Sequence, residues 1–149
     1  MTMITISDVR EYMPDVEDYG IQSYDDFFEK TRQDIFRRLR IDWWLSRRYS
    51  RSITIVDSSI AGEMDSTKVD ETQFTRCAVF YCLAYYILPQ LTKWNPDGDQ
   101  FIQMMSYYKE RYNEEWALVL QDGVRYDDNE DSTYSFTESV PVPTNRLVR

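Results

Sequence analysis

The chain has 149 residues, which suits one domain, and it is rich in aromatic residues (12 Tyr, 7 Phe, 4 Trp) but poor in Gly (4) and Pro (5). This composition favours a mainly helical fold over a β architecture with many turns. Histidine is absent, which excludes Ser-His and Cys-His nucleophile systems and most zinc or di-iron sites, and the net charge of −9 argues against a dedicated nucleic-acid binder.

The first part of the chain predicts two helices separated by an acidic loop. Ser7 can cap a short helix that ends at Met13, because Pro14 disfavours helical conformation in the residue before it. Residues 15–22 form the predicted loop, and Ser23 is the expected cap of a longer helix. The apolar stripe of that longer helix consists of Phe27, Phe28, Thr31, Ile35 and Leu39.

The segment 52–60 alternates weakly and is rich in β-branched residues, which indicates a short strand or an extended connector. A third helix is predicted from Glu71 to about Thr92, with a capping box formed by Asp70 and Gln73. Pro89 should kink or end this helix, because it has no amide for the carbonyl of the preceding turn.

Twelve apolar residues run without a break from Cys77 to Leu88, so the third helix is expected to be buried on every side. Twelve residues are too few to span a bilayer, where about 20 are needed. Cys77 and Cys82 lie about 140° apart on such a helix and cannot pair within it. They are expected to be buried free thiols of a protein from a reducing compartment.

A fourth helix is predicted from Asp99 to about Gln121, preceded by a second capping box at Asp97 and Gln100. Gly123 suits the residue just past its end. Its apolar face consists of Phe101, Met104, Met105, Tyr108, Tyr112, Trp116 and Val119. Residues 1–123 are thus predicted to form a small four-helix bundle.

Residues 124–149 are predicted to form an extended tail that begins with the acidic turn DDNED. Tyr134 to Thr137 suits a short strand, and the sequence VPVP favours an extended, polyproline-like path. The tail has too few apolar residues to fold alone, so we expect it to become ordered on a neighbouring subunit. Its expected contact residues are Tyr134, Phe136, Val140, Arg146 and Arg149.

Six arginines and one aspartate give residues 37–51 a net charge of +5, which leaves −14 for the rest of the chain. A solvated helix face is the simplest explanation of such a run. All six cations are Arg, however, and two Trp lie among them, and both residue types are enriched at protein interfaces. We therefore predict a contact with another protein subunit made by Arg37, Arg38, Arg40, Trp43, Trp44, Arg47, Arg48 and Arg51.

No catalytic, cofactor or metal site is predicted. Glu17 and Asp26 have a spacing similar to the paired acids of phage-type lysozymes, but the Thr expected six residues further on is Arg32. Acid pairs at any chosen spacing are expected by chance among 26 acidic residues. The four glycines are dispersed and form no phosphate-binding loop.

Four phrases of the sequence resemble the head–tail connector (adaptor) proteins of tailed bacteriophages. They are SDVREYMPDVEDYGIQSYDDFF, DIFRRLRIDWW, QFTRCAVFYCLAYYILPQL and YYKERYNEEWALVLQDGVRYD, and they cover most of residues 7–128. The resemblance implies a helical subunit of a ring, of twelve copies, below the portal in the virion. Such a ring extends the DNA channel and docks the neck or tail-completion protein. DNA passes through it without specific binding, because an acidic wall does not retain a polyanion.

Two other classes of function stay open from the sequence. One is a small helical phage regulator or inhibitor of a host protein, which would not assemble into rings. The other is a hydrolase that uses carboxylates alone, whose activity would disappear on changing Glu17 or Asp26. On every reading the protein is expected to be made in the host cytoplasm, without a membrane anchor.

Overall fold

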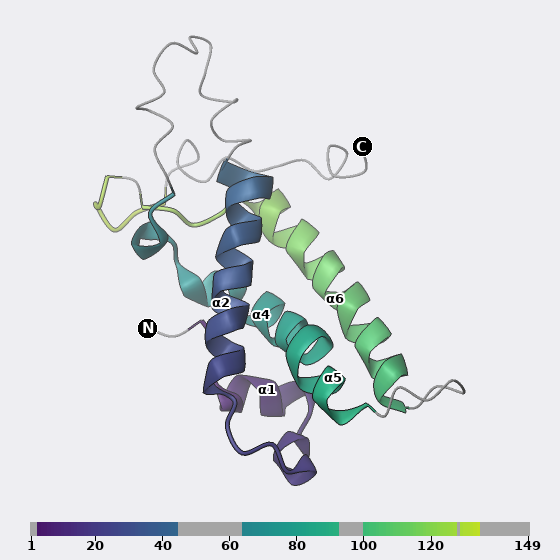
Figure 1. Ribbon diagram of the computed structural model, residues 1–149. Coiled ribbons are helices and arrows are strands. Elements are labelled where there is room, and N and C mark those ends of the chain that lie inside the picture. The colour runs from purple at the N-terminus through teal and green to yellow at the C-terminus, as the bar shows by residue number, and fades with distance from the viewer. Residues whose placement is uncertain (1–2, 45–63, 93–99, 128, 135–149) are drawn as a thin grey trace.

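A computed structural model describes residues 3–44, 64–92, 100–127 and 129–134, and it confirms the predicted mainly α fold (Figure 1). The four predicted helical segments are all present. The α-helices are α1 (Ile6–Tyr12), α2 (Asp25–Leu39), α4 (Thr75–Cys82), α5 (Leu88–Leu91) and α6 (Gln100–Asp122). Short 3₁₀ turns lie at η1 (Val16–Tyr19), η3 (Ser66–Lys68) and η4 (Glu71–Phe74), and π-helical turns at η2 (Arg40–Trp44) and η5 (Leu83–Ile87).

The first two helices begin at residues other than the predicted caps. Thr5, not Ser7, precedes α1, and its backbone amide donates to the Asp8 carboxylate at 2.8 Å. This arrangement is a capping box, in which the third residue of the helix satisfies the amide of the cap. Tyr24, not Ser23, precedes α2, and the Tyr24 hydroxyl donates to the Val16 carbonyl at 2.8 Å. The start of α2 is therefore fixed by a tertiary hydrogen bond and not by a side-chain cap.

The third predicted helix is continuous in sequence but changes its winding three times. It opens as η4, continues as α4, widens into η5 and closes as α5. In η5 the amide of Leu88 donates to the carbonyl of Leu83, five residues earlier. A π-type turn just before Pro89 lets the chain pass a residue that has no amide to offer to Tyr85. The helix therefore continues to Leu91 beyond the proline.

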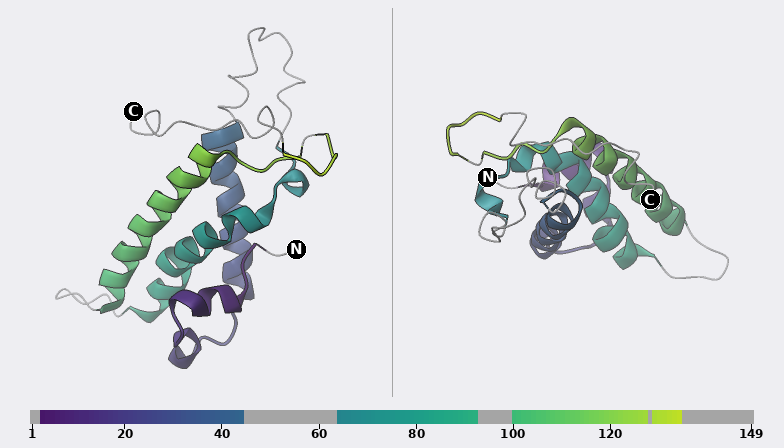
Figure 2. Two further views of the ribbon diagram at one scale, coloured as in Figure 1. Left: turned by 180° about the vertical axis from the view of Figure 1, so that it is seen from behind. Right: turned by 90° about the horizontal axis from the view of Figure 1, so that it is seen from above.

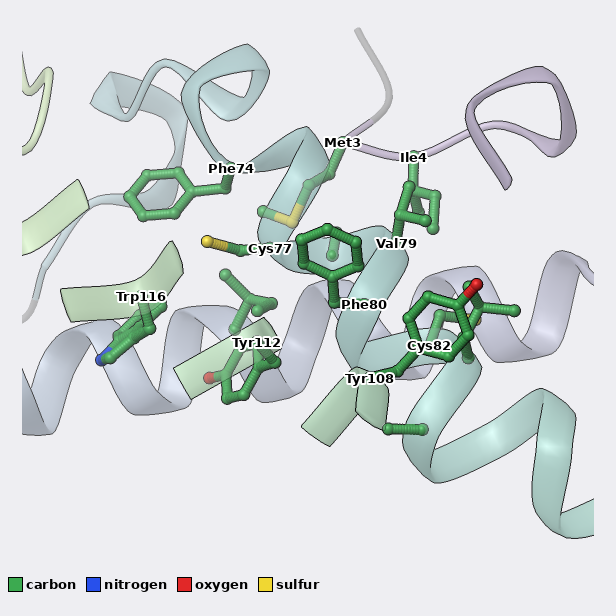
Figure 3. Packing of buried hydrophobic residues seen from close by; sticks show 14 of the residues in the cluster. Met3, Ile4, Phe74, Cys77, Val79, Phe80, Cys82, Tyr108, Tyr112 and Trp116 are labelled. Carbon is green, nitrogen blue, oxygen red and sulfur yellow. The ribbon is translucent and has the colours of Figure 1, made fainter. Parts of the chain in front are cut away.

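This third helical segment lies between α2 and α6, and its apolar residues face both neighbours (Figure 2). Within the run Cys77–Leu88 the predicted burial is confirmed, because Tyr85 is the one residue of that run in the exposed class. Cys77 and Cys82 are buried free thiols, as predicted. Figure 3 shows the centre of this core, where Phe80 and Tyr108 stack with ring centroids 6.0 Å apart.

The end of α6 is fixed by a glycine and by a side chain from η4. Gly123 has φ of +94°, and its amide donates to the Val119 carbonyl at 3.1 Å, which confirms its predicted role. Gln73 does not complete a capping box with Asp70. Its side-chain amide donates to the Gly123 carbonyl at 2.8 Å and its carbonyl accepts from the Arg125 amide at 2.8 Å.

After α6 the chain returns to the core. Val69 and Tyr126 form an isolated antiparallel bridge, and Val124 and Tyr126 are buried. Residues 124–127 therefore pack with the helical part, so the boundary predicted at residue 123 falls too early. The described residues contain no strand; the strand predicted at 52–60 lies outside them, and the one predicted at 134–137 does so except for Tyr134, which is irregular.

Candidate interaction surfaces

The two tryptophans of the arginine-rich segment lie in the packing of the subunit itself. Trp43 is fully buried, and its ring centroid lies 5.5 Å from that of Tyr126. Trp44 is half-buried and lies 5.3 Å from the same Tyr126 ring. These contacts join η2 to the segment that follows α6. The prediction that Trp43 is an external anchor is therefore wrong, because its ring has no surface left for a partner.

Asp42 is the polar centre of this end of the molecule. Its carboxylate accepts from the Trp116 indole N–H at 2.8 Å and from Arg38 Nε at 3.2 Å. The Arg38 guanidinium also lies 5.8 Å from the centroid of the Tyr112 ring. Arg38 thus forms an ion pair with Asp42 of η2 and a cation–π contact with Tyr112 of α6, so it has partners within the subunit although its side chain is exposed.

Arg37, Arg38 and Arg40 are all exposed at the end of α2, and of these Arg38 is engaged by Asp42. Ile41, beside them, is 57% exposed. We call Arg37, Arg40 and Ile41 the basic end of α2. It combines exposed positive charge with an exposed apolar side chain, as protein contact surfaces often do. The remaining predicted contact residues Arg47, Arg48 and Arg51 lie outside the described residues.

A second surface, which the sequence analysis missed, lies on the outer side of α6. Tyr107 is 55% exposed and Leu118 is 53% exposed. Arg111 and Glu114 stand between them at steps of four, three and four residues, so all four share one helix face. Arg111 Nη1 and a Glu114 carboxylate oxygen lie 3.5 Å apart. We call these four residues the outer face of α6.

The signal for this face was available in the sequence. Tyr107 and Leu118 stand outside the predicted apolar stripe of the fourth helix, at positions where polar residues are usual. Single exposed apolar residues are common on soluble proteins, so these two positions gain meaning only together with the exposure that the structure shows on one helix face.

The predicted tail contacts fall mainly outside the described residues. Tyr134 is described and is 45% exposed, without strand structure. Phe136, Val140, Arg146 and Arg149 lie beyond the described part of the chain.

Asp34 on α2 binds two tyrosines of the third helical segment. The hydroxyls of Tyr81 and Tyr86 both donate to the same Asp34 oxygen, Tyr81 at 3.1 Å. Burial, together with the nearby Asp34 carboxylate, raises the pKa of Tyr81 to about 12 and also raises that of Tyr86. Both phenols are neutral and donate to Asp34. These hydrogen bonds, which we call the Asp34 latch, join α2 to Tyr81 of α4 and Tyr86 of η5.

The paired acids Glu17 and Asp26 differ in their surroundings. Glu17 forms an ion pair with Arg10 at 2.7 Å, with both side chains about half exposed (50% and 46%), and Asp26 is exposed at the start of α2. Glu17 also lines an open groove of about 850 Å³ between residues 3–6 and the start of α2. Asp25 and Glu29 also line this groove, but all three carboxylates are exposed, whereas a general acid–base pair needs a desolvated pocket.

Neither thiol is activated. Burial raises the pKa of Cys82 to about 12 and also raises that of Cys77.

Across the described ranges, no group of three or more His, Cys, Asp or Glu side chains is placed to hold a metal ion. No described helix has the length and apolar content needed to cross a bilayer.

Comparison with known proteins gives no relative. No family model, no curated protein and no solved structure matches this chain.

Proposed function

We propose that the protein is a structural head–tail connector subunit of a tailed bacteriophage. In this role twelve copies form a ring below the portal, extend the DNA channel and dock the neck or tail-completion protein. The resemblance of residues 7–128 to connector proteins supports the proposal, together with the mainly α fold. The observation that carries it is the outer face of α6, where Tyr107 and Leu118 leave apolar area uncovered by the subunit.

A closed ring needs two different surfaces on each subunit, because each copy contacts its two neighbours through opposite sides. The outer face of α6 supplies one apolar surface; its Arg111 and Glu114 form a pair, and the adjacent exposed Glu110 adds one net negative charge. The basic end of α2 supplies a second surface with the opposite charge and an exposed Ile41. Apolar contact with complementary charge at its border is the usual composition of a specific interface.

The charge of the chain suits the inside of a DNA channel. A net charge of −9 gives a surface that repels phosphates, so DNA passes without being held. The basic residues at the end of α2 are a local exception, and contact with a neighbouring subunit or with the portal would neutralise them.

Imaging of the purified protein by negative-stain electron microscopy, alone and mixed with portal rings, tests this function. We expect rings of uniform diameter in at least one of the two samples. A protein that stays monomeric with the portal and binds a host protein instead would be a regulator or inhibitor, and the connector proposal would be abandoned.

A pair of charge-reversal variants tests the assignment of the surface. Arg37→Glu with Arg40→Glu should prevent ring formation, because it places acidic groups against the acidic neighbour. Lys30→Glu makes the same kind of change at an exposed position of α2 away from this end and should leave rings intact. Both proteins should keep the helical content of the wild type.

A further inference from the structure

The outer face of α6 has an internal symmetry that a ring contact does not need. Its four residues are spaced by four, three and four positions, so the spacing is the same from either end. Tyr107 and Leu118 stand at equal distances from the centre of this stretch, and so do Arg111 and Glu114. Each apolar residue of the face thus has an apolar counterpart, and each charged residue has a counterpart of opposite charge.

A helix with such a face can pair with a second copy of itself in the antiparallel direction. A twofold axis through the centre of the stretch places Tyr107 of each copy against Leu118 of the other, and Arg111 against Glu114. This is the property of an isologous contact, in which residue i contacts residue j and residue j contacts residue i. The same spacing is that of the contact positions of a coiled coil, which recur about every 3.5 residues.

The parallel arrangement of the same two helices is unfavourable. It places Arg111 against Arg111 and Glu114 against Glu114, and like charges across an interface repel one another. Charge complementarity therefore selects the antiparallel arrangement. It also selects a copy of this chain as the occupant of the face, because the pattern complements its own reverse.

The charged residues of this face are free to change partners. The side chains of Arg111 and Glu114 are 43% and 65% exposed, and an exposed ion pair of this kind contributes little to stability. The Arg111 guanidinium also lies 5.5 Å from the centroid of the Phe80 ring, which keeps it on this side of α6. In Figure 1 and in both views of Figure 2, α6 lies at an edge of the helical part, where a second helix can approach it.

We propose that two copies of the free subunit associate through the outer faces of their α6 helices, antiparallel about a twofold axis. Tyr107 packs on Leu118 of the other copy at each end of the contact, and two ion pairs between Arg111 and Glu114 lie between these ends. The contact is about 16 Å long. It is small beside the roughly 20–30 residues a side of a standard interface, so we expect a weak dimer with a Kd of about 10⁻⁴ M.

The dimer and the ring exclude one another, because the same face of α6 is the subunit contact of the ring. This relation rests on the proposed connector function, whereas the dimer itself does not. In concentrated free protein the dimer covers the apolar face, and it dissociates when subunits assemble on the portal. At low micromolar concentration the free subunit is monomeric and the face is open.

Analytical ultracentrifugation of the full chain tests the dimer, over concentrations from about 10 μM to 1 mM that bracket the expected Kd. It separates a species of twice 18.0 kDa from the monomer and from a ring. Arg111→Glu and Glu114→Arg should each raise the Kd by about tenfold or more, because each places like charges at both ion-pair positions. Lys30→Glu, on α2 away from this face, is the control and should dimerise like the wild type.

An equimolar mixture of the two charge variants is the decisive sample. One chain then carries two acidic residues on the face and the other carries two basic ones, so the mixed dimer regains both contacts. Neither chain regains the ion pair within its own helix, so recovery cannot come from the subunit alone. We expect the mixture to dimerise at least as well as the wild type, and a mixture as weak as the single variants would overturn the contact.

The outcome is separable from that of the connector proposal. Rings on the portal with no wild-type dimer at 1 mM, ten times the Kd of about 10⁻⁴ M, would overturn this inference and leave the connector role standing. A dimer without rings would support the inference and count against the connector role.

The direction of pairing is tested by disulfide cross-linking. A mixture of Tyr107→Cys and Leu118→Cys chains should link readily on mild oxidation, because these positions face one another, and the native Cys77 and Cys82 are buried. Each variant alone should link several-fold more slowly, since the two copies of one position lie about 16 Å apart along the paired helices. Faster linking in the single-variant samples than in the mixture would indicate a parallel contact and overturn the arrangement.

Discussion

Two stretches of the molecule carry large apolar side chains among charges, and they use them in opposite ways. In η2, just after α2, Trp43 is fully buried, and Asp42 beside it binds Trp116 and Arg38 of the same subunit. On the outer face of α6, Tyr107 and Leu118 are more than half exposed beside an Arg–Glu pair. The comparison teaches that residue type alone does not locate a contact surface, because burial within the subunit must be known first.

The largest effect is expected from Trp43→Ala. Removing a fully buried indole leaves a cavity between η2 and Tyr126, and such truncations lower the free energy of unfolding by about 3–5 kcal/mol. Chemical denaturation followed by circular dichroism measures the loss. Ile41→Ala, two residues away at a 57% exposed position, should change it by less than about 0.5 kcal/mol. If the two variants lower the free energy of unfolding by similar amounts, the assignment of Trp43 as buried and Ile41 as exposed is contradicted.

A smaller effect is expected from Asp42→Ala, which leaves the Trp116 indole N–H and Arg38 without their shared acceptor. A part-buried donor that loses its partner costs about 1–3 kcal/mol. Asp42→Asn retains an acceptor oxygen and should lose less in the same denaturation measurement. If the two variants are equally stable, the carboxylate does not join α2 to α6 in the way described.

The helices themselves were largely predictable, because the apolar periodicity of the sequence survives in the structure. The end of α6 at Gly123 and the burial of the Cys77–Leu88 run followed from local rules. The starts of α1 and α2 did not follow. Ser7 and Ser23 were reasonable caps, but Thr5 meets Asp8 with better spacing, and a tertiary hydrogen bond of Tyr24 fixes the second start.

The contact surfaces were less predictable, for a physical reason. Trp43 contacts Tyr126, a residue more than 80 positions later, and Asp42 accepts from Trp116. Such long-range pairs decide which side of a helix remains uncovered, and no local pattern contains them.

The smallest effect is expected at high pH from the Asp34 latch. Tyr81 has a pKa raised from 10.0 to about 12 in the folded protein, chiefly by burial. The folded state therefore binds more protons at Tyr81 than the unfolded state between these values, so the contribution of Tyr81 to stability is full below pH 10 and is lost as the pH rises toward 12. Tyr81→Phe should show a shallower fall in thermal unfolding temperature over this range. Tyr107→Phe, at an exposed position, should follow the wild type; a wild-type slope in Tyr81→Phe would contradict the latch.

The outer face of α6 can be tested most directly by the reactivity of a thiol placed on it. Cys77 and Cys82 are buried, so Leu118→Cys introduces a thiol that reacts against a low background. Its rate of modification by a thiol reagent is compared between free subunits and assembled rings, with Asn113→Cys, about 140° round the same helix, as the control. The account predicts that assembly slows the reaction at position 118 by about tenfold or more, because reactivity requires access, and slows it less at 113. Equal rates at position 118 in the two states would contradict the assignment of this face as the subunit contact.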